Sequence, residues 1–153
     1  MGAAVGLLTA WKAVDEYRRQ GTIRRIEFFL EARVRLTDNA TFQEIINLLE
    51  SDSPALTAIP VRSKISFVGF SEEIALLVNS RVIRDEVAHY MFGYYALRCW
   101  ESTNFWILDD RPEKPLDKEH EPYWAVFRDF VQRMQPIRQQ LLTGKYQKRR
   151  YSL

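Results

Sequence analysis

Apolar residues recur at helical spacing along nearly the whole chain. In the first third of the chain, apolar residues recur at steps of three and four: Ile23, Ile26, Phe29 or Leu30, and Val34. Residues at these steps lie along one side of an α-helix, as expected of a helix packed on a bundle. The pattern predicts a long first helix from about Ala3 to Leu36.

Two further helices follow in the next third of the chain. The stretch "TFQEIINLLE" begins with Thr41 and has Glu44 three residues later, which predicts a capping box at the start of a second helix. Pro60 suits the first turn of a third helix that runs to about Asn79. This third helix is apolar on more than one side, so we expect it to lie centrally in the bundle.

The last third predicts two more helices. One begins at Arg84 or Asp85 and extends to about Ile107, and another begins at Pro122 and stops at Gly144. No stretch alternates between apolar and polar residues in the way that a sheet requires. The fold class predicted is therefore all-α, a bundle of four to five helices with a long N-terminal helix.

Composition is consistent with one folded unit and suggests its internal divisions. The chain has 153 residues, of which 46% are hydrophobic and 27% charged, with a formal net charge of +2; these values are typical of a globular domain. The single cysteine, Cys99, forms no internal disulfide and indicates a reducing compartment. We expect an apolar N-terminal segment with a basic flank at 1–22, a helical bundle domain at 23–144 and a basic tail at 145–153.

The N-terminal segment suggests contact with a membrane. "MGAAVGLLTAW" carries no charge and precedes a basic stretch, which resembles the cytoplasmic flank of a membrane helix. Eleven helical residues cover roughly half of a hydrocarbon core. Four residues are expected at a bilayer or an oligomer contact: Val5, Leu7, Leu8 and Trp11. Four more are expected at lipid headgroups: Arg18, Arg19, Arg24 and Arg25. The location predicted is the cytoplasmic face of a bacterial inner membrane, or the cytoplasm.

Arg84 and His89 could form a catalytic pair. Histidine titrates near neutral pH and arginine binds phosphate bidentately. With Asp85 after the arginine, the pair resembles the motif of HEPN-type ribonucleases, helical proteins in which two such pairs meet across a dimer interface and cleave RNA without metal. A five-residue step within a helix leaves two side chains about 140° apart. Arg84 would therefore have to lie in a non-helical entry turn for the pair to converge.

The fourth predicted helix is dense in aromatic residues, which cannot all lie on one side. We expect subunit contacts at Tyr90, Gly93, Tyr94 and Trp100, while a surface that stacks nucleic-acid bases is the alternative. Two histidines and one cysteine in the chain do not form a metal-ligand set. No metal, no cofactor and no small-molecule ligand is predicted.

The segment "FVGFSEEIALLVNSRVIRDEVAHYMFGYYALRCWES" resembles an uncharacterised bacterial family with an N-terminal membrane helix and a cytosolic helical domain. The residues that match are Phe67, Phe70, Glu72, Glu73, Phe92, Gly93, Tyr94 and Trp100. The chain is also similar in size, helical class and charge layout to the small membrane-associated accessory protein of an RNA-targeting CRISPR type. That resemblance implies a role at a membrane and no catalysis.

Two functions remain open from the sequence. The first is a non-enzymatic, membrane-associated helical protein that forms homo-oligomers and serves as an accessory or effector in bacterial signalling or antiviral defence. The alternative is a HEPN-type, metal-independent ribonuclease that uses Arg84 and His89 across a dimer interface, with RNA as its partner.

Overall fold

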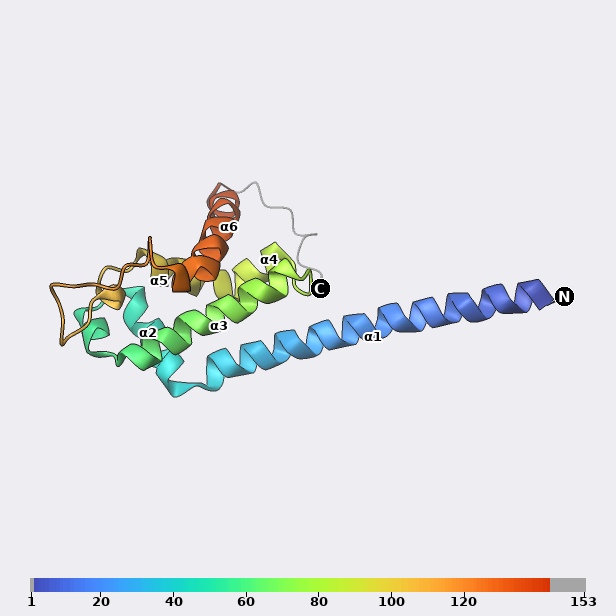
Figure 1. The fold of residues 1–153 in the computed structure, drawn as a ribbon, viewed down its shortest axis with the longest axis horizontal. Coiled ribbons are helices and arrows are strands. Elements are labelled where there is room, and N and C mark those ends of the chain that lie inside the picture. The colour runs from blue at the N-terminus through green and yellow to red at the C-terminus, as the bar shows by residue number, and fades with distance from the viewer. Residues whose placement is uncertain (1, 144–153) are drawn as a thin grey trace.

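The computed structural model describes the backbone of residues 2–143 and the side chains of residues 16, 20, 21 and 23–143. Its helices are α1 (Gly2–Asp38), α2 (Ala40–Glu50), α3 (Val61–Asn79), α4 (Asp85–Ala88), a π-helical turn η2 (His89–Gly93), α5 (Tyr94–Glu101) and α6 (Ala125–Leu142). The segments α4, η2 and α5 follow one another without a break (Figure 1). Counted as one helix, they give the described chain five longer helices, beside three short 3₁₀ helices, Pro54–Ala58, Asn104–Trp106 and Pro122–Trp124, and no strand. The all-α prediction is confirmed.

The second helix begins with a different cap from the one expected. Asn39 is the N-cap of α2, and its side-chain oxygen accepts a hydrogen bond of 3.0 Å from the backbone N–H of Phe42. The predicted capping box of Thr41 and Glu44 is wrong, because the helix already includes Ala40 and Thr41. Asparagine is among the strongest N-cap residues, so the earlier start satisfies a backbone donor equally well.

The predicted fourth helix ends at Glu101, six residues before the expected Ile107. Ser102 leaves the helical conformation with φ −59° and ψ 135°. The carboxylate of Asp52 accepts hydrogen bonds from the Ser102 hydroxyl and from the backbone N–H groups of Thr103 and Asn104. These contacts from a distant loop cap a new turn, so the chain leaves the helix where apolar spacing alone would have continued it.

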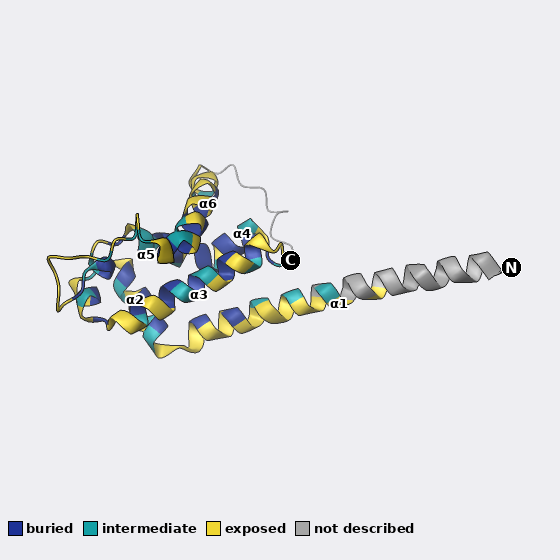
Figure 2. Ribbon diagram, in the orientation of Figure 1, coloured by how far each residue is buried: buried dark blue, intermediate teal, exposed yellow. Residues whose placement is uncertain are grey.

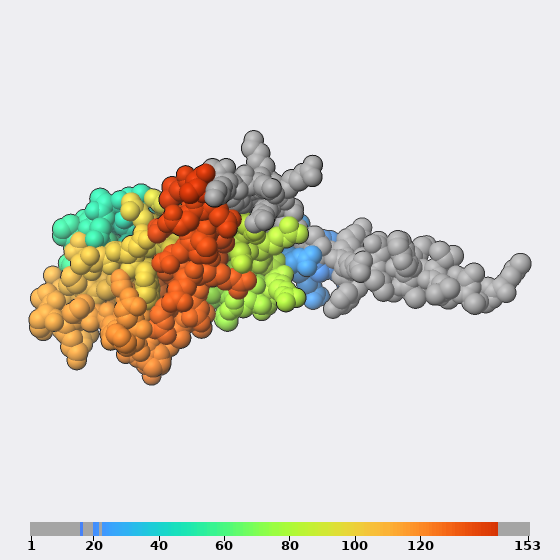
Figure 3. All heavy atoms as spheres, turned by 90° about the horizontal axis from the view of Figure 1, so that it is seen from above, coloured from blue at the N-terminus to red at the C-terminus, as the bar shows by residue number. Residues whose placement is uncertain are grey.

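The core lies where α3, α6 and the π-helical turn meet. Aromatic rings link α2, α3 and the π-helical turn: the ring centroids of Phe42 and Phe67 lie 5.4 Å apart, and those of Phe70 and Phe92 lie 5.8 Å apart. In the space-filling view, α6 lies across the bundle between the loop that precedes it and the end of α3 (Figure 3). The central position expected for the third helix is consistent with its eight buried residues.

The first helix extends far beyond the bundle. Only its C-terminal part lies beside α2 and α3, and the N-terminus stands well away from every other element (Figure 1). In this C-terminal part, Ala32 and Leu36 are buried, and the ring of half-buried Phe29 lies 6.1 Å from that of Phe92. The N-terminal part of α1 therefore extends as a helical arm beyond the bundle (Figure 1).

Candidate functional site: the exposed apolar face of α1

Four aliphatic side chains form an exposed stripe on α1. We call Ile23, Ile26, Leu30 and Val34 the outer stripe; their exposed fractions are 48%, 37%, 50% and 54%. They follow steps of three, four and four residues, so they share one side of the helix. The residues of α1 that pack on the bundle are Phe29, Ala32 and Leu36. The expectation that Ile23, Ile26 and Val34 form the packed face is therefore wrong, because a second apolar face performs that role.

The basic residues predicted for headgroup contact lie partly within the described region. Arg24 is exposed and Arg25 is half-buried, next to the start of the outer stripe. The side chains of Arg18 and Arg19, and those of the predicted bilayer residues Val5, Leu7, Leu8 and Trp11, lie outside the described residues. The predicted basic tail, 145–153, also lies outside them.

A groove of about 320 Å³ separates α1 from α3 beside the bundle. Its lining is mostly apolar, with one ion pair: Phe28, Glu31, Ala32, Arg35, Glu73, Ile74, Leu76 and Leu77. The guanidinium of Arg35 donates to both carboxylate oxygens of Glu73, at 2.6 and 3.3 Å. This pair fixes the end of α1 on α3 and raises the pKa of Arg35, chiefly through the hydrogen bond to Glu73. Figure 2 shows that exposed residues follow the side of α1 that faces away from α3.

Arg84 lies in the entry turn that a catalytic pair would require. It is the N-cap of α4, with an extended backbone at φ −77° and ψ 152°, and its side chain is exposed. His89 is only 5% exposed and begins the π-helical turn. Neither ring nitrogen of His89 has a hydrogen-bond partner among the described residues. Burial lowers the pKa of His89, and the positive charge of Arg138 lowers it further.

This environment gives little support to a ribonuclease site. A general base must come within about 3 Å of the proton that it removes. The imidazole of His89 is enclosed by the bundle, so a ribose hydroxyl does not reach it without a rearrangement of the core. Its lowered pKa also disfavours the protonated form that would serve as general acid. π-Helical turns are frequent at functional sites. Here the turn packs against the rest of the bundle.

The four predicted subunit contacts divide into two groups. Tyr90 and Tyr94 are exposed, and the hydroxyl of Tyr94 donates to Glu50 at 3.1 Å. Gly93 is buried: a Cβ added to it would lie 2.9 Å from the sulfur of Met134 on α6. Gly93 is thus packed against α6 of its own chain, and this burial is at odds with its assignment to a subunit contact.

Trp100 likewise packs on its own chain. Its ring lies 6.0 Å from that of Phe127 on α6, and the ammonium of Lys118 lies 5.1 Å from its centroid. Lys118 also donates a hydrogen bond to the backbone oxygen of Trp100. Tyr90 and Tyr94 therefore remain the surface residues of this predicted contact, whereas Gly93 and Trp100 are occupied by packing in the bundle.

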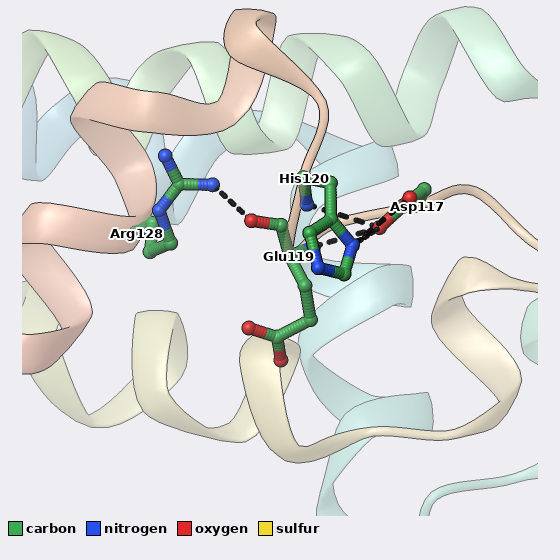
Figure 4. A network of polar contacts seen from close by, with 4 residues as sticks. All are labelled: Asp117, Glu119, His120 and Arg128. Carbon is green, nitrogen blue, oxygen red and sulfur yellow. Dashed lines mark hydrogen bonds and ion pairs between the residues drawn. The ribbon is translucent and has the colours of Figure 1, made fainter.

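The second histidine lies in the loop before α6. His120 is exposed; its Nδ1 lies 3.1 Å from the carboxylate of Asp117, and its backbone N–H donates to that carboxylate (Figure 4). This backbone hydrogen bond is the main cause that lowers the pKa of Asp117. Arg128 of α6 donates to the backbone oxygen of Glu119 and holds the loop. The loop is therefore held in place by hydrogen bonds within its own turn and by Arg128. Among the described residues, no cluster of three His, Cys, Asp or Glu side chains could hold a metal ion.

The fold and the exposed face define an all-α bundle with an extended, partly apolar N-terminal arm. Within the described part of the chain, no helix combines the length and the apolar character that crossing a bilayer requires. Comparison with protein-family models, with curated proteins and with solved structures found no match to this chain.

Proposed function

We propose that this protein is a non-enzymatic accessory protein that holds its helical bundle at an anionic membrane surface through α1 and associates with further copies of itself. The observation that carries the proposal is the outer stripe, four exposed aliphatic side chains on a helix that extends beyond the bundle. An apolar face that the fold does not cover favours contact with lipid or with another protein surface.

The charge of α1 supports the membrane part of the proposal. Arg24 is exposed near the outer stripe, and the sequence places Arg18 and Arg19 further towards the N-terminus. A basic side chain near an anionic leaflet contributes about 1 kcal/mol. Attachment of this kind needs no membrane-spanning helix, because the apolar side of a surface helix enters only the headgroup and upper acyl region. A role in bacterial signalling or antiviral defence rests on the sequence resemblance alone.

Vesicle binding tests the membrane proposal directly. The full chain is sedimented with phosphatidylcholine vesicles that contain or lack phosphatidylserine, at low and at high salt. We expect binding to the anionic vesicles that weakens as salt is added, because salt screens exposed charges. A variant with Arg18, Arg19, Arg24 and Arg25 all changed to Gln should bind at least about tenfold more weakly, since 1.4 kcal/mol corresponds to a factor of ten.

The matched control changes the same number of charges elsewhere. Exposed basic residues outside α1 are replaced by Gln in a second variant: Arg62, Arg81, Arg111 and Lys114. This variant should bind anionic vesicles nearly as well as the unchanged protein. Absence of binding to anionic vesicles, or an equal loss in both variants, would contradict attachment through α1.

The ribonuclease hypothesis is tested separately with RNA and the full chain. Incubation in the presence of a metal chelator should leave RNA intact, because the imidazole of His89 lies inside the bundle. Cleavage that is abolished by His89→Ala, with the variant still folded, would refute a non-enzymatic role.

A further inference from the structure

His89 places an imidazole without a hydrogen bond inside the bundle. The side chain is 5% exposed, and among the described residues neither of its ring nitrogens has a partner. A buried polar group without a partner destabilises a fold, and the same group destabilises it further once it is charged. The packing around His89 is therefore suited to the neutral imidazole.

The second half of α6 covers this imidazole. A Cβ on Gly93 would lie 2.9 Å from the sulfur of Met134 and 3.3 Å from Cδ2 of His89. Arg138 follows Met134 by four residues, so it lies one turn further along the same side of α6. Its positive charge acts on His89. Protonation of His89 would thus bring a second cation close to Arg138.

Pro136 lies between Met134 and Arg138 and weakens the helix at that point. Proline has no backbone N–H, so it donates no helical hydrogen bond to the carbonyl of Gln132, and helices bend preferentially at such positions. The segment that follows, residues 136–142, could therefore move while the first part of α6 stays in place.

Two kinds of contact hold residues 136–142 on the bundle. Ile137 and Leu141 pack against the core. Arg138 donates hydrogen bonds to both carboxylate oxygens of Glu101 on α5, at 2.9 and 2.5 Å. The ion pair thus fixes the same residue whose charge acts on His89.

We infer that residues 136–142 form a latch that closes over neutral His89 and opens at Pro136 when His89 is protonated. The inference goes beyond the proposed function and does not depend on it. Opening would separate Arg138 from the imidazolium and give the ring access to water. It would also expose Ile137 and Leu141, so acidification would create an apolar surface at this end of the bundle.

The direction of the pH dependence follows from the closed and open states. Burial, and then the charge of Arg138, lower the pKa of His89 while the latch is closed, whereas an imidazole in water has a pKa of about 6.5. Closing is therefore fully favoured above about pH 6.5 and weakens as the pH falls through the lower pKa of the closed state. One proton changes the opening equilibrium by up to about tenfold for each pH unit in that window.

The acids on the helix of His89 leave this direction unchanged. Asp85, four residues before His89, is paired with Arg133 of α6 at 2.9 Å, and Glu86 is half-buried. Burial and Arg138, not these acids, are the main causes of the lowered pKa of His89. Glu101 stays charged in the window, because the hydrogen bonds from Arg138 lower its pKa.

The remaining charged groups on the neighbouring helices act elsewhere. On α5, Arg98 donates to the backbone oxygen of Glu50 at the end of α2. On α3, Glu72 accepts a hydrogen bond from the backbone N–H of Phe127, and burial raises the pKa of Glu72. Protonation of Glu72 would loosen the first turn of α6, at the opposite end of that helix from the latch.

Hydrogen–deuterium exchange of the full chain at pH 7.5 and pH 5.5 tests the latch. Mass spectrometry gives protection factors, corrected for the pH dependence of intrinsic exchange, for residues 137–142, for residues 126–132 and for residues 67–78 of α3. We expect protection of residues 137–142 to fall by about three- to tenfold at pH 5.5, with the other two segments nearly unchanged. An equal loss in all three segments, a loss confined to residues 126–132, or no loss in residues 137–142 overturns the latch.

Two glutamine variants identify the titrating group. His89→Gln keeps this residue polar and neutral, so the protection of residues 137–142 should be the same at both pH values. His120→Gln is the matched control, because His120 is the other histidine of the chain, and it should behave like the unchanged protein. If His89→Gln still loses protection at pH 5.5, another group controls the segment and the inference is wrong.

Pro136→Ala tests the hinge with His89 in place, so this test does not depend on the folding of a His89 variant. Alanine restores the backbone donor to the carbonyl of Gln132. Protection of residues 137–142 should therefore rise at least about tenfold at both pH values, because proline is strongly disfavoured inside a helix. Equal protection in Pro136→Ala and the unchanged protein overturns opening at Pro136.

Discussion

Gly93 and Met134 are packed so closely that a Cβ added to Gly93 would lie 2.9 Å from Sδ and 3.1 Å from Cγ of Met134. Gly93 ends the π-helical turn, and Met134 is fully buried at the middle of α6. The absence of a side chain at residue 93 is thus what allows α6 to approach the turn. The contact also encloses His89, whose Cδ2 would lie 3.3 Å from the same Cβ.

Replacement of Gly93 by valine should destabilise the protein. Overpacking in a filled core costs about 1–3 kcal/mol. In the double variant Gly93→Val with Met134→Ala, the cost should be smaller than the sum of the single costs, because the shortened residue 134 makes room. Urea unfolding of the four proteins measures this coupling. Additive losses would show that Gly93 and Met134 do not limit one another.

The stability of the protein should depend on the charge state of His89. Its pKa is lowered in the fold by burial and by Arg138, whereas the unfolded chain has a pKa of about 6.5. The stabilisation from a neutral His89 is therefore complete above about pH 6.5 and is lost as the pH falls through the lower, folded pKa. His89→Leu should remove this part of the pH dependence.

Unfolding free energies at several pH values between 5 and 8 measure the effect. His120→Gln is the control, because His120 is exposed and its replacement should leave the pH profile close to that of the unchanged protein. If His89→Leu and the unchanged protein lose stability in parallel over this range, burial of His89 does not affect the titration.

Asp52 should contribute strongly to the stability of the turn after α5. Its carboxylate accepts hydrogen bonds from Ser102, Thr103 and Asn104, and its own backbone has a φ of 46°. Asp52→Ala removes a cap worth about 0.5–2 kcal/mol and places alanine in a left-handed conformation. Asp52→Asn keeps one acceptor oxygen and tolerates positive φ, so its loss should be clearly smaller. Equal losses in both would indicate that the carboxylate is dispensable.

The two faces of α1 should respond differently to the same substitution. Leu36→Ala removes a buried side chain and should cost about 2–5 kcal/mol. Leu30→Ala changes an exposed residue of the outer stripe and should change the unfolding free energy by less than about 0.5 kcal/mol at dilute, monomeric concentration. Chemical denaturation of both variants gives the comparison. A large cost at Leu30 would mean that the outer stripe is covered within the single chain.

Local sequence features predicted some helix boundaries well and missed others. Pro60 marked the start of α3, and Asn79, where that helix ends, was also predicted. The end of α5 at Glu101 was missed because Asp52, about fifty residues earlier, supplies the hydrogen bonds that stop the helix. The π-helical turn was also missed; its last residue, Gly93, packs closely against Met134 of α6, a contact that no local pattern indicates.

The sequence by itself determined that this protein is all-α with a long first helix, because helical periodicity and caps depend on residues a few positions apart. The sequence also showed that Arg84 had to lie in a non-helical entry turn if its side chain was to converge with that of His89. Only the tertiary structure decided which apolar face of α1 packs on the bundle and which stays exposed, and that His89 lies inside. Burial depends on residues that are distant in the chain, and no local pattern specifies which of two apolar faces they cover.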